Sequence, residues 1–148
     1  MAPRITSMKG LLIVLALSLA APPLSAQIKR ASCFRYGPDT VRIAGTLSRR
    51  MYYGVPGYGE DPKHDEQESG FYLDLTAPFC TVQGADATEV AQTNVRRIQL
   101  VLDRRSYDAL RPFLGKQVRL RGTLFGATTG HHHTPVLLDV LQSAHIEP

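Results

Sequence analysis

The sequence contains only two cysteines, Cys33 and Cys80, and no Cys-x-x-Cys pair. A cysteine-based zinc site needs several thiolates at close spacing, so this pattern excludes the usual cysteine-rich metal sites. Two cysteines in an oxidising compartment most simply form one disulfide. We therefore predict a disulfide between Cys33 and Cys80, with a pair of buried free thiols as the alternative.

The sequence also lacks a long apolar run of the kind that crosses a membrane comfortably. Residues 11–21 (LLIVLALSLAA) are apolar but short, and they follow the basic residues Arg4 and Lys9. This order of segments is typical of an export signal. We predict a signal peptide over residues 1–26; cleavage after Ala20 and an uncleaved membrane anchor are the alternatives.

Excess charge of one sign is small as well. The chain has 17 basic and 13 acidic residues, a formal net charge of +4, and two of the basic residues belong to the predicted signal peptide. Net charge therefore gives no argument for nucleic acid as a partner. Residues 27–148 are enough for a single domain with its own core, and we expect that domain to be periplasmic or secreted.

Apolar residues alternate with polar or small ones in much of the exported part, which indicates half-buried strands. Five segments show this pattern: 41–47, 71–75, 98–102, 118–124 and 136–140. Residues 106–114 have helical spacing instead, with Ser106 as the expected N-cap and Gly115 just after the end. The order predicts an all-β protein, a five-stranded OB-like Greek-key barrel with one short helix between strands 3 and 4. The alternative is a small β-sandwich.

Two of the expected strands resemble each other, VRIAGTL (41–47) and VRLRGTL (118–124), and each has a glycine in its middle. A mid-strand glycine suits a bulge or a tight bend at the corner of a barrel. We therefore expect both strands to bend sharply in the same way, each at its glycine. The predicted core consists of Val41, Ile43, Leu73, Leu75, Leu100, Leu120, Leu124 and Leu138.

Six segments resemble the bacterial family DUF4431, from about Cys33 to Val140. They are CFRYGPDTVRIAGTLSRR, YGVPGYGE, FYLDLTAPFC, RIQLVL, LRPFLGKQVRLRGTLF and TGHHHTPVLL, of which the last is the most specific. The loop GVPGYGEDPKHDE follows the family pattern only loosely. The resemblance implies an exported bacterial protein with an OB-like domain, and it implies no particular reaction.

Two loops hold the candidate site, residues 51–70 and 126–135, because these connections flank the usual binding face of an OB-fold. If the triple histidine is extended, His131 and His133 point to one side, as alternate ligands of a metal do. His64 or Asp65 could complete a site for zinc or another divalent transition metal. The alternative is that the three histidines are structural.

The same face could bind a larger ligand. Tyr53 and Tyr58 could stack on a sugar or anchor a protein, since tyrosine has a flat apolar face and a polar tip. His132 and Thr134 are the polar candidates beside them. We predict an exported envelope binding module for an envelope protein or a cell-wall glycan. A metal-binding protein is the alternative, and a hydrolase is a further one, although the sequence has no G-x-S-x-G motif and we assign no catalytic residue.

Overall fold

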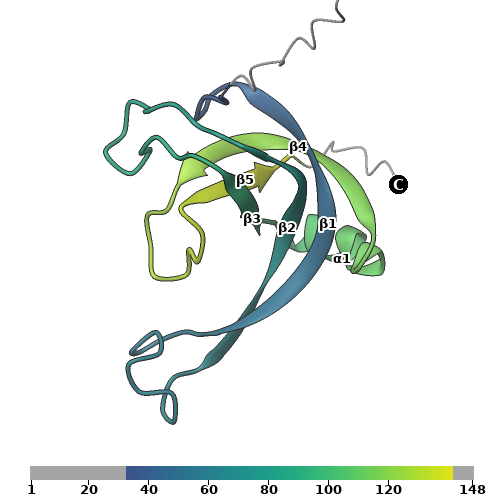
Figure 1. Cartoon of the computed structure of the whole chain (residues 1–148). Coiled ribbons are helices and arrows are strands. Elements are labelled where there is room, and N and C mark those ends of the chain that lie inside the picture. Colours follow the sequence, from purple (N-terminus) through teal and green to yellow (C-terminus); the bar gives the residue numbers. More distant parts are fainter. Residues whose placement is uncertain (1–32, 142–148) are drawn as a thin grey trace, which may run out of the picture.

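The computed structural model describes residues 33–141, so the predicted signal peptide (1–26) lies outside the described residues. Five strands form a closed barrel in the order β1-β2-β3-β5-β4 (Figure 1). Neighbouring strands are antiparallel, except that β5 runs parallel to β3. The strands are β1 (Thr40–Tyr53), β2 (Gln67–Phe79), β3 (Val95–Val101), β4 (Gln117–Gly126) and β5 (Val136–Val140). The predicted all-β, OB-like barrel is confirmed.

A single short α-helix, α1 (Arg104–Leu110), lies between β3 and β4 in the described part of the chain, and a 3-10 turn, η1 (Arg111–Phe113), continues it. The helix was expected at this place, but its N-cap is Asp103 rather than Ser106. The Asp103 carboxylate accepts a hydrogen bond from the Ser106 amide at 2.7 Å. The prediction of the cap was therefore wrong by three residues, because either polar side chain can begin a helix.

The barrel interior is filled by the inward-facing residues of all five strands. Seven of the eight predicted core residues are buried, and Leu75 is partly buried and packs against them. Helix α1 contributes Leu110, which is 2% exposed. The alternation of apolar residues thus located the core correctly, since each barrel strand has one face inside and one outside.

The two mid-strand glycines lie where neighbouring backbones approach closely. A Cβ on Gly45 of β1 would collide with the carbonyl oxygen of Asp74 in β2. A Cβ on Gly122 of β4 would collide in the same way with the carbonyl oxygen of Asp139 in β5. Because β1 and β4 are adjacent, with Val41 opposite Gly122, the two similar sequences meet side by side. Gly45 lets β2 approach β1 closely, and Gly122 lets β5 approach β4 in the same way.

A disulfide joins Cys33 to Cys80, as predicted, with their Cα atoms 4.5 Å apart. It ties the segment before β1 to the residue after β2. The Phe34 amide donates to the Cys80 carbonyl oxygen at 2.7 Å, and the Phe34 ring packs edge-on against Phe79. Among residues 33–141, no helix is long and apolar enough to span a membrane.

Strands β1 and β2 extend beyond the barrel as a two-stranded arm, which projects away from the other strands in Figure 1. β1 pairs with β2 as far as Tyr53 opposite Gln67, but it pairs with β4 only up to Thr46. β2 in turn pairs with β3 only from Phe71 onward. We call residues 48–53 and 67–70 the hairpin arm. Much of the expected loop 51–70 is thus strand, and the connection itself spans residues 54–66.

Candidate binding site

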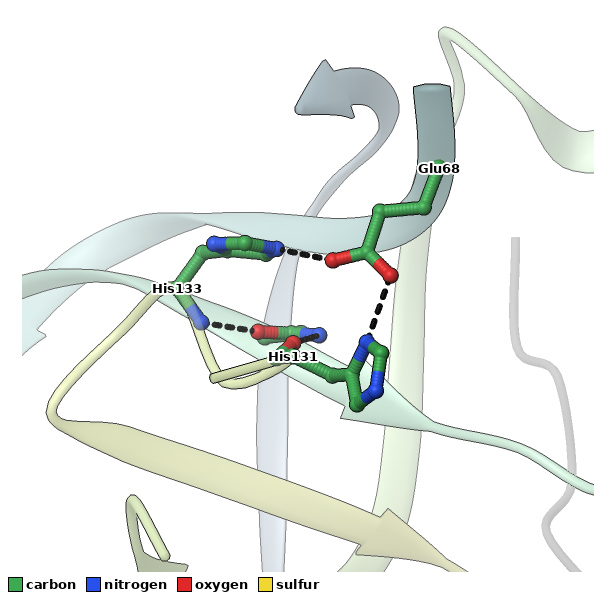
Figure 2. Close-up of polar contacts among 4 residues, drawn as sticks. Glu68, His131 and His133 are labelled. Carbon is green, nitrogen blue, oxygen red and sulfur yellow. Dashed lines mark hydrogen bonds and ion pairs between the residues drawn. The ribbon is translucent and has the colours of Figure 1, made fainter. Parts of the chain in front are cut away.

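Glu68 on the hairpin arm holds two histidines of the β4–β5 loop at once (Figure 2). Its Oε2 lies 2.6 Å from Nδ1 of His131, and its Oε1 lies 2.8 Å from Nε2 of His133. An ionised carboxylate only accepts hydrogen bonds, so each ring donates an N–H to it. Glu68 therefore places a proton on Nδ1 of His131 and on Nε2 of His133.

Gln99 of β3 fastens the backbone of the same loop. Its side-chain Oε1 accepts from the His133 amide at 2.6 Å, and its Nε2 donates to the His131 carbonyl oxygen at 2.9 Å. The Gln99 main-chain amide donates to the Thr134 hydroxyl, which donates in turn to the Val136 carbonyl oxygen. The histidine loop is thus attached to both β2 and β3.

Two tyrosines pack on the histidine rings. Tyr52 stacks on His133 with ring centroids 3.9 Å apart and planes 5° apart. Tyr58 meets His131 edge-on at 5.5 Å and stays 43% exposed. The Gly130 backbone lies against the Tyr58 ring, and a Cβ there would be 2.7 Å from Cζ. These contacts bring the tip of the hairpin arm against the histidine loop.

The electrostatics of the site favour an ionised Glu68. Burial opposes the charge, but the hydrogen bonds from His131 and His133 outweigh it and lower the pKa of Glu68 below its ordinary value of 4.5. The pKa of His132 is lowered from 6.5, first by burial and then by the charges of the neighbouring histidines. His132 is therefore neutral at pH 7, which lets its Nδ1 accept from the Thr128 amide at 2.9 Å.

An open cleft of about 270 Å³ lies beside this cluster. Its polar side is formed by Glu68, Gln99, His131 and His133, and Ser69 and Gly70 contribute the backbone of β2. Its apolar side is formed by Phe71, Leu100, Leu102 and Tyr107. Because Tyr107 belongs to α1, the short helix closes one end of the cleft. The cleft thus lies at the junction of the hairpin arm, the end of β3, the helix and the histidine loop.

The structure brings together only some of the residues singled out from the sequence. His131 and His133 lie side by side, but their carboxylate partner is Glu68. His64 instead contacts Asp61 at 2.6 Å, and the Asp65 carboxylate accepts from the amides of Gly57 and Gly59 at 2.7 Å each. Asp65 thus orders the connection 54–66 at the tip of the hairpin arm. Within the described residues, no three His, Cys, Asp or Glu side chains are arranged to hold a metal ion.

The four predicted ligand-binding residues occupy different environments. Tyr58 lies beside His131, as described above. Tyr53 is 41% exposed and alternates with Tyr52, so it projects from the opposite face of the arm. His132 packs edge-on against Phe125 rather than on Glu68, and Thr134 is buried. Tyr58 is thus the member of this set that lies beside the Glu68 cluster.

Two residues central to the site were not singled out from the sequence. Glu68 was one of several acids in a charged segment, and Gln99 was an ordinary polar position in a strand. The alternation of β2 could have identified Glu68. If the strand is extended backward from Phe71, residues 68 and 72 lie on the same face, opposite to Phe71. Nothing local distinguished Gln99, because its partners lie more than 30 residues away.

Residues 97–144 match the model of a family described as "Domain of unknown function (DUF4431)". The matched segment begins in β3 and includes α1, β4, the histidine loop and β5. It contains Gln99, His131 and His133, whereas Glu68 lies before it. No curated protein matches the chain. The resemblance to DUF4431 expected from the sequence is therefore confirmed over residues 97–144.

Proposed function

We propose that the protein is an exported envelope module that binds its ligand in the cleft beside Glu68. The observation that carries this proposal is the attachment of the histidine loop to both β2 and β3 through Glu68 and Gln99. These contacts order a polar and apolar cleft on the face that OB-folds use for binding. A concave site with converging polar groups and an apolar wall is the usual form of a ligand pocket.

Export is supported by two independent features. The N-terminal sequence has the order of a signal peptide, with basic residues before a short apolar run. The disulfide between Cys33 and Cys80 is a bond that persists in oxidising compartments. Intact-mass measurement on the periplasmic fraction of expressing bacteria tests this part of the proposal. We expect a mass that lacks residues 1–26, and the full mass recovered from the membrane fraction would contradict export.

Binding is favoured over the two alternatives by the state of the side chains. Glu68 engages Nδ1 of His131 and Nε2 of His133, which leaves each ring one nitrogen that could bind a metal. Among the described residues, however, no three His, Cys, Asp or Glu side chains are arranged to hold a metal ion. A hydrolase needs a nucleophile or a water placed by a base, whereas the ring hydrogen bonds found for these two histidines in the described part of the chain go to Glu68. We therefore place the cleft, rather than a metal or a catalytic group, at the centre of the proposal.

The test is a chemical-shift titration of the ¹⁵N-labelled protein with fractionated soluble extracts of the bacterial envelope, including cell-wall fragments. We expect at least one fraction to shift the amides of Ser69, Gly70 and Gln99. The variant Leu102→Trp fills the cleft and should abolish these shifts. The matched control Val90→Trp places the same side chain at a position that is 48% exposed and outside the cleft lining, and it should retain them.

Two results would contradict the proposal. One is that no fraction shifts the cleft amides of the unaltered protein. The other is that Leu102→Trp, shown to be folded by its spectrum, binds as well as Val90→Trp does. In either case the cleft would not be the binding site.

A further inference from the structure

The cleft contains an unpaired edge of β2. Backbone groups of successive residues in a strand point to opposite sides, so alternate residues serve alternate neighbours. The Glu66 amide and carbonyl bond to Val55 and Gly54, which places the even-numbered residues of β2 toward β1. Leu47 of β1 bonds instead toward the β4 side, through Lys116 and Gly115, in agreement with that alternation. The backbone groups of Gln67 and Ser69 therefore point away from β1.

On that side the neighbouring strand stops too early to pair with them. The ladder between β2 and β3 begins at Phe71 opposite Leu100, and β3 ends at Val101. The chain then turns into α1. In residues 33–141, no strand continues the ladder beside Ser69 or Gln67. The cleft lies at this point, since Ser69, Gly70, Leu100 and Leu102 all line it.

The free hydrogen-bonding groups of the cleft thus include main-chain groups of β2. Both oxygens of Glu68 and both polar atoms of the Gln99 amide are already bonded to the histidine loop. The amide and carbonyl of Ser69 are not used by a neighbouring strand. A ligand that offers its own alternating N–H and C=O groups would satisfy this edge, as in recognition by strand addition.

We propose that the cleft binds an extended polypeptide segment, which adds as a short strand to the edge of β2 at Gln67 and Ser69. This inference rests on the proposed function and names the class of its ligand. An added strand would continue the line of β3 between the hairpin arm and α1. Its backbone would pair with Ser69, and its side chains would alternate between the two faces of the cleft.

The two faces define the side chains of that segment. Side chains on the inner face would meet Phe71, Leu102 and Tyr107, which form the apolar wall. Side chains on the outer face would lie next to Glu68, whose side chain is 29% exposed and whose carboxylate is ionised. The favoured segment therefore alternates apolar residues with basic ones. A glycan has no such alternation of donors and acceptors, so it would leave the edge of β2 unpaired.

The experiment uses a capped hexapeptide, Val-Lys-Val-Lys-Val-Lys, titrated into the ¹⁵N-labelled protein. We expect the Ser69 and Gln67 amides to shift most. In Ser69→Pro the edge N–H is removed on the side away from β1, where Ser69 has no strand partner, so the fold should survive. Ser69→Ala is the matched control, because both variants lose the hydroxyl bonded to Arg49 but only the proline variant loses the N–H. Binding to Ser69→Pro should be at least about tenfold weaker than binding to Ser69→Ala.

A second comparison does not depend on the folding of a variant. The same peptide, N-methylated at every residue, cannot donate to the edge of β2 from either side and should bind the unaltered protein at least about tenfold more weakly. Equal binding of the methylated and unmethylated peptides, or no binding of either, would overturn strand addition. If cell-wall glycan fragments shift the cleft amides and the peptide does not, the peptide inference fails while the proposed function stands. If neither ligand nor any envelope fraction shifts them, both fail.

Discussion

At the scale of single residues, Glu68 has the largest role in shaping the site, since one carboxylate holds two rings. Its folded pKa is lowered, so its contribution to stability is present above pH 4.5 and is lost as the pH falls through the lowered value. We expect Glu68→Gln to cost about 1 to 2 kcal/mol at pH 7. Denaturant unfolding between pH 7 and 3 should show this cost shrinking below pH 4.5. A cost that is constant down to pH 3 would contradict the two hydrogen bonds to an ionised Glu68.

The lowered pKa of His132 predicts a second pH range in which the stability of the protein changes. Because burial lowers its pKa, the unfolded chain takes up the proton more readily than the folded chain. Its contribution is therefore complete above pH 6.5 and is lost as the pH falls below that value. His132→Asn keeps an acceptor for the Thr128 amide but does not titrate. We expect this variant to be less destabilised than the unaltered protein on acidification from pH 7 to 5, measured by thermal unfolding. Parallel curves would show that His132 does not titrate differently on folding.

The sequence could reveal the histidines of this cluster but not their partners. Three adjacent histidines are rare enough to notice. The predicted OB-like topology placed their loop beside the segment that forms the arm, and the contacts with Glu68 agree with this. Glu68 was indistinguishable from the acids around it, because the ring that each acid meets depends on the register of β1 and β2. His64 and Asp65 were plausible for the same reason, yet local hydrogen bonds within residues 54–66 occupy both.

At the scale of elements, the glycines of β1 and β4 should be far less replaceable than a glycine in a turn. In Gly45→Ala and Gly122→Ala the new Cβ meets backbone oxygen, which cannot move without disturbing the barrel. We expect each to cost about 3 kcal/mol or more. Gly115→Ala meets open space and carries only the strain of its positive φ, about 1 kcal/mol. Chemical denaturation of the three variants tests this order, and equal costs would contradict the close approach.

The elements themselves were predictable because five strands alternate strictly, but several ends of β1, β2 and β3 were not. The two that matter for the site form the hairpin arm. Residues 48–53 (SRRMYY) and 67–70 (QESG) carry no apolar alternation, since the arm that they form has no core to face. Pairing between the two strands alone makes them extended. The cleft depends on this arm, and so the most informative part of the site lies where the sequence pattern is weakest.

At the scale of the whole molecule, the disulfide and the cleft lie at opposite ends of β2. Glu68 and Ser69 are near its start, and Cys80 follows its last residue. At about 3.3 Å per residue this separates them by about 40 Å along the strand. Stability from the disulfide and binding at the cleft should therefore be separable. The bond closes a loop of 47 residues, for which chain entropy gives about 4 kcal/mol.

We expect the double variant Cys33→Ala/Cys80→Ala to unfold about 10 °C or more below the unaltered protein. It should nevertheless keep the same chemical shifts at Ser69, Gly70 and Gln99 at 20 °C. The ladder between β1 and β2 holds Ser69 and Gly70 without the disulfide, and the ladder between β2 and β3 holds Gln99. Thermal unfolding and an amide spectrum of the same sample measure both quantities. Loss of the cleft shifts at a temperature where the variant is still folded would mean that the N-terminal tie controls the site. An unchanged melting temperature would mean that packing of Phe34 on Phe79 already fixes this segment without the bond.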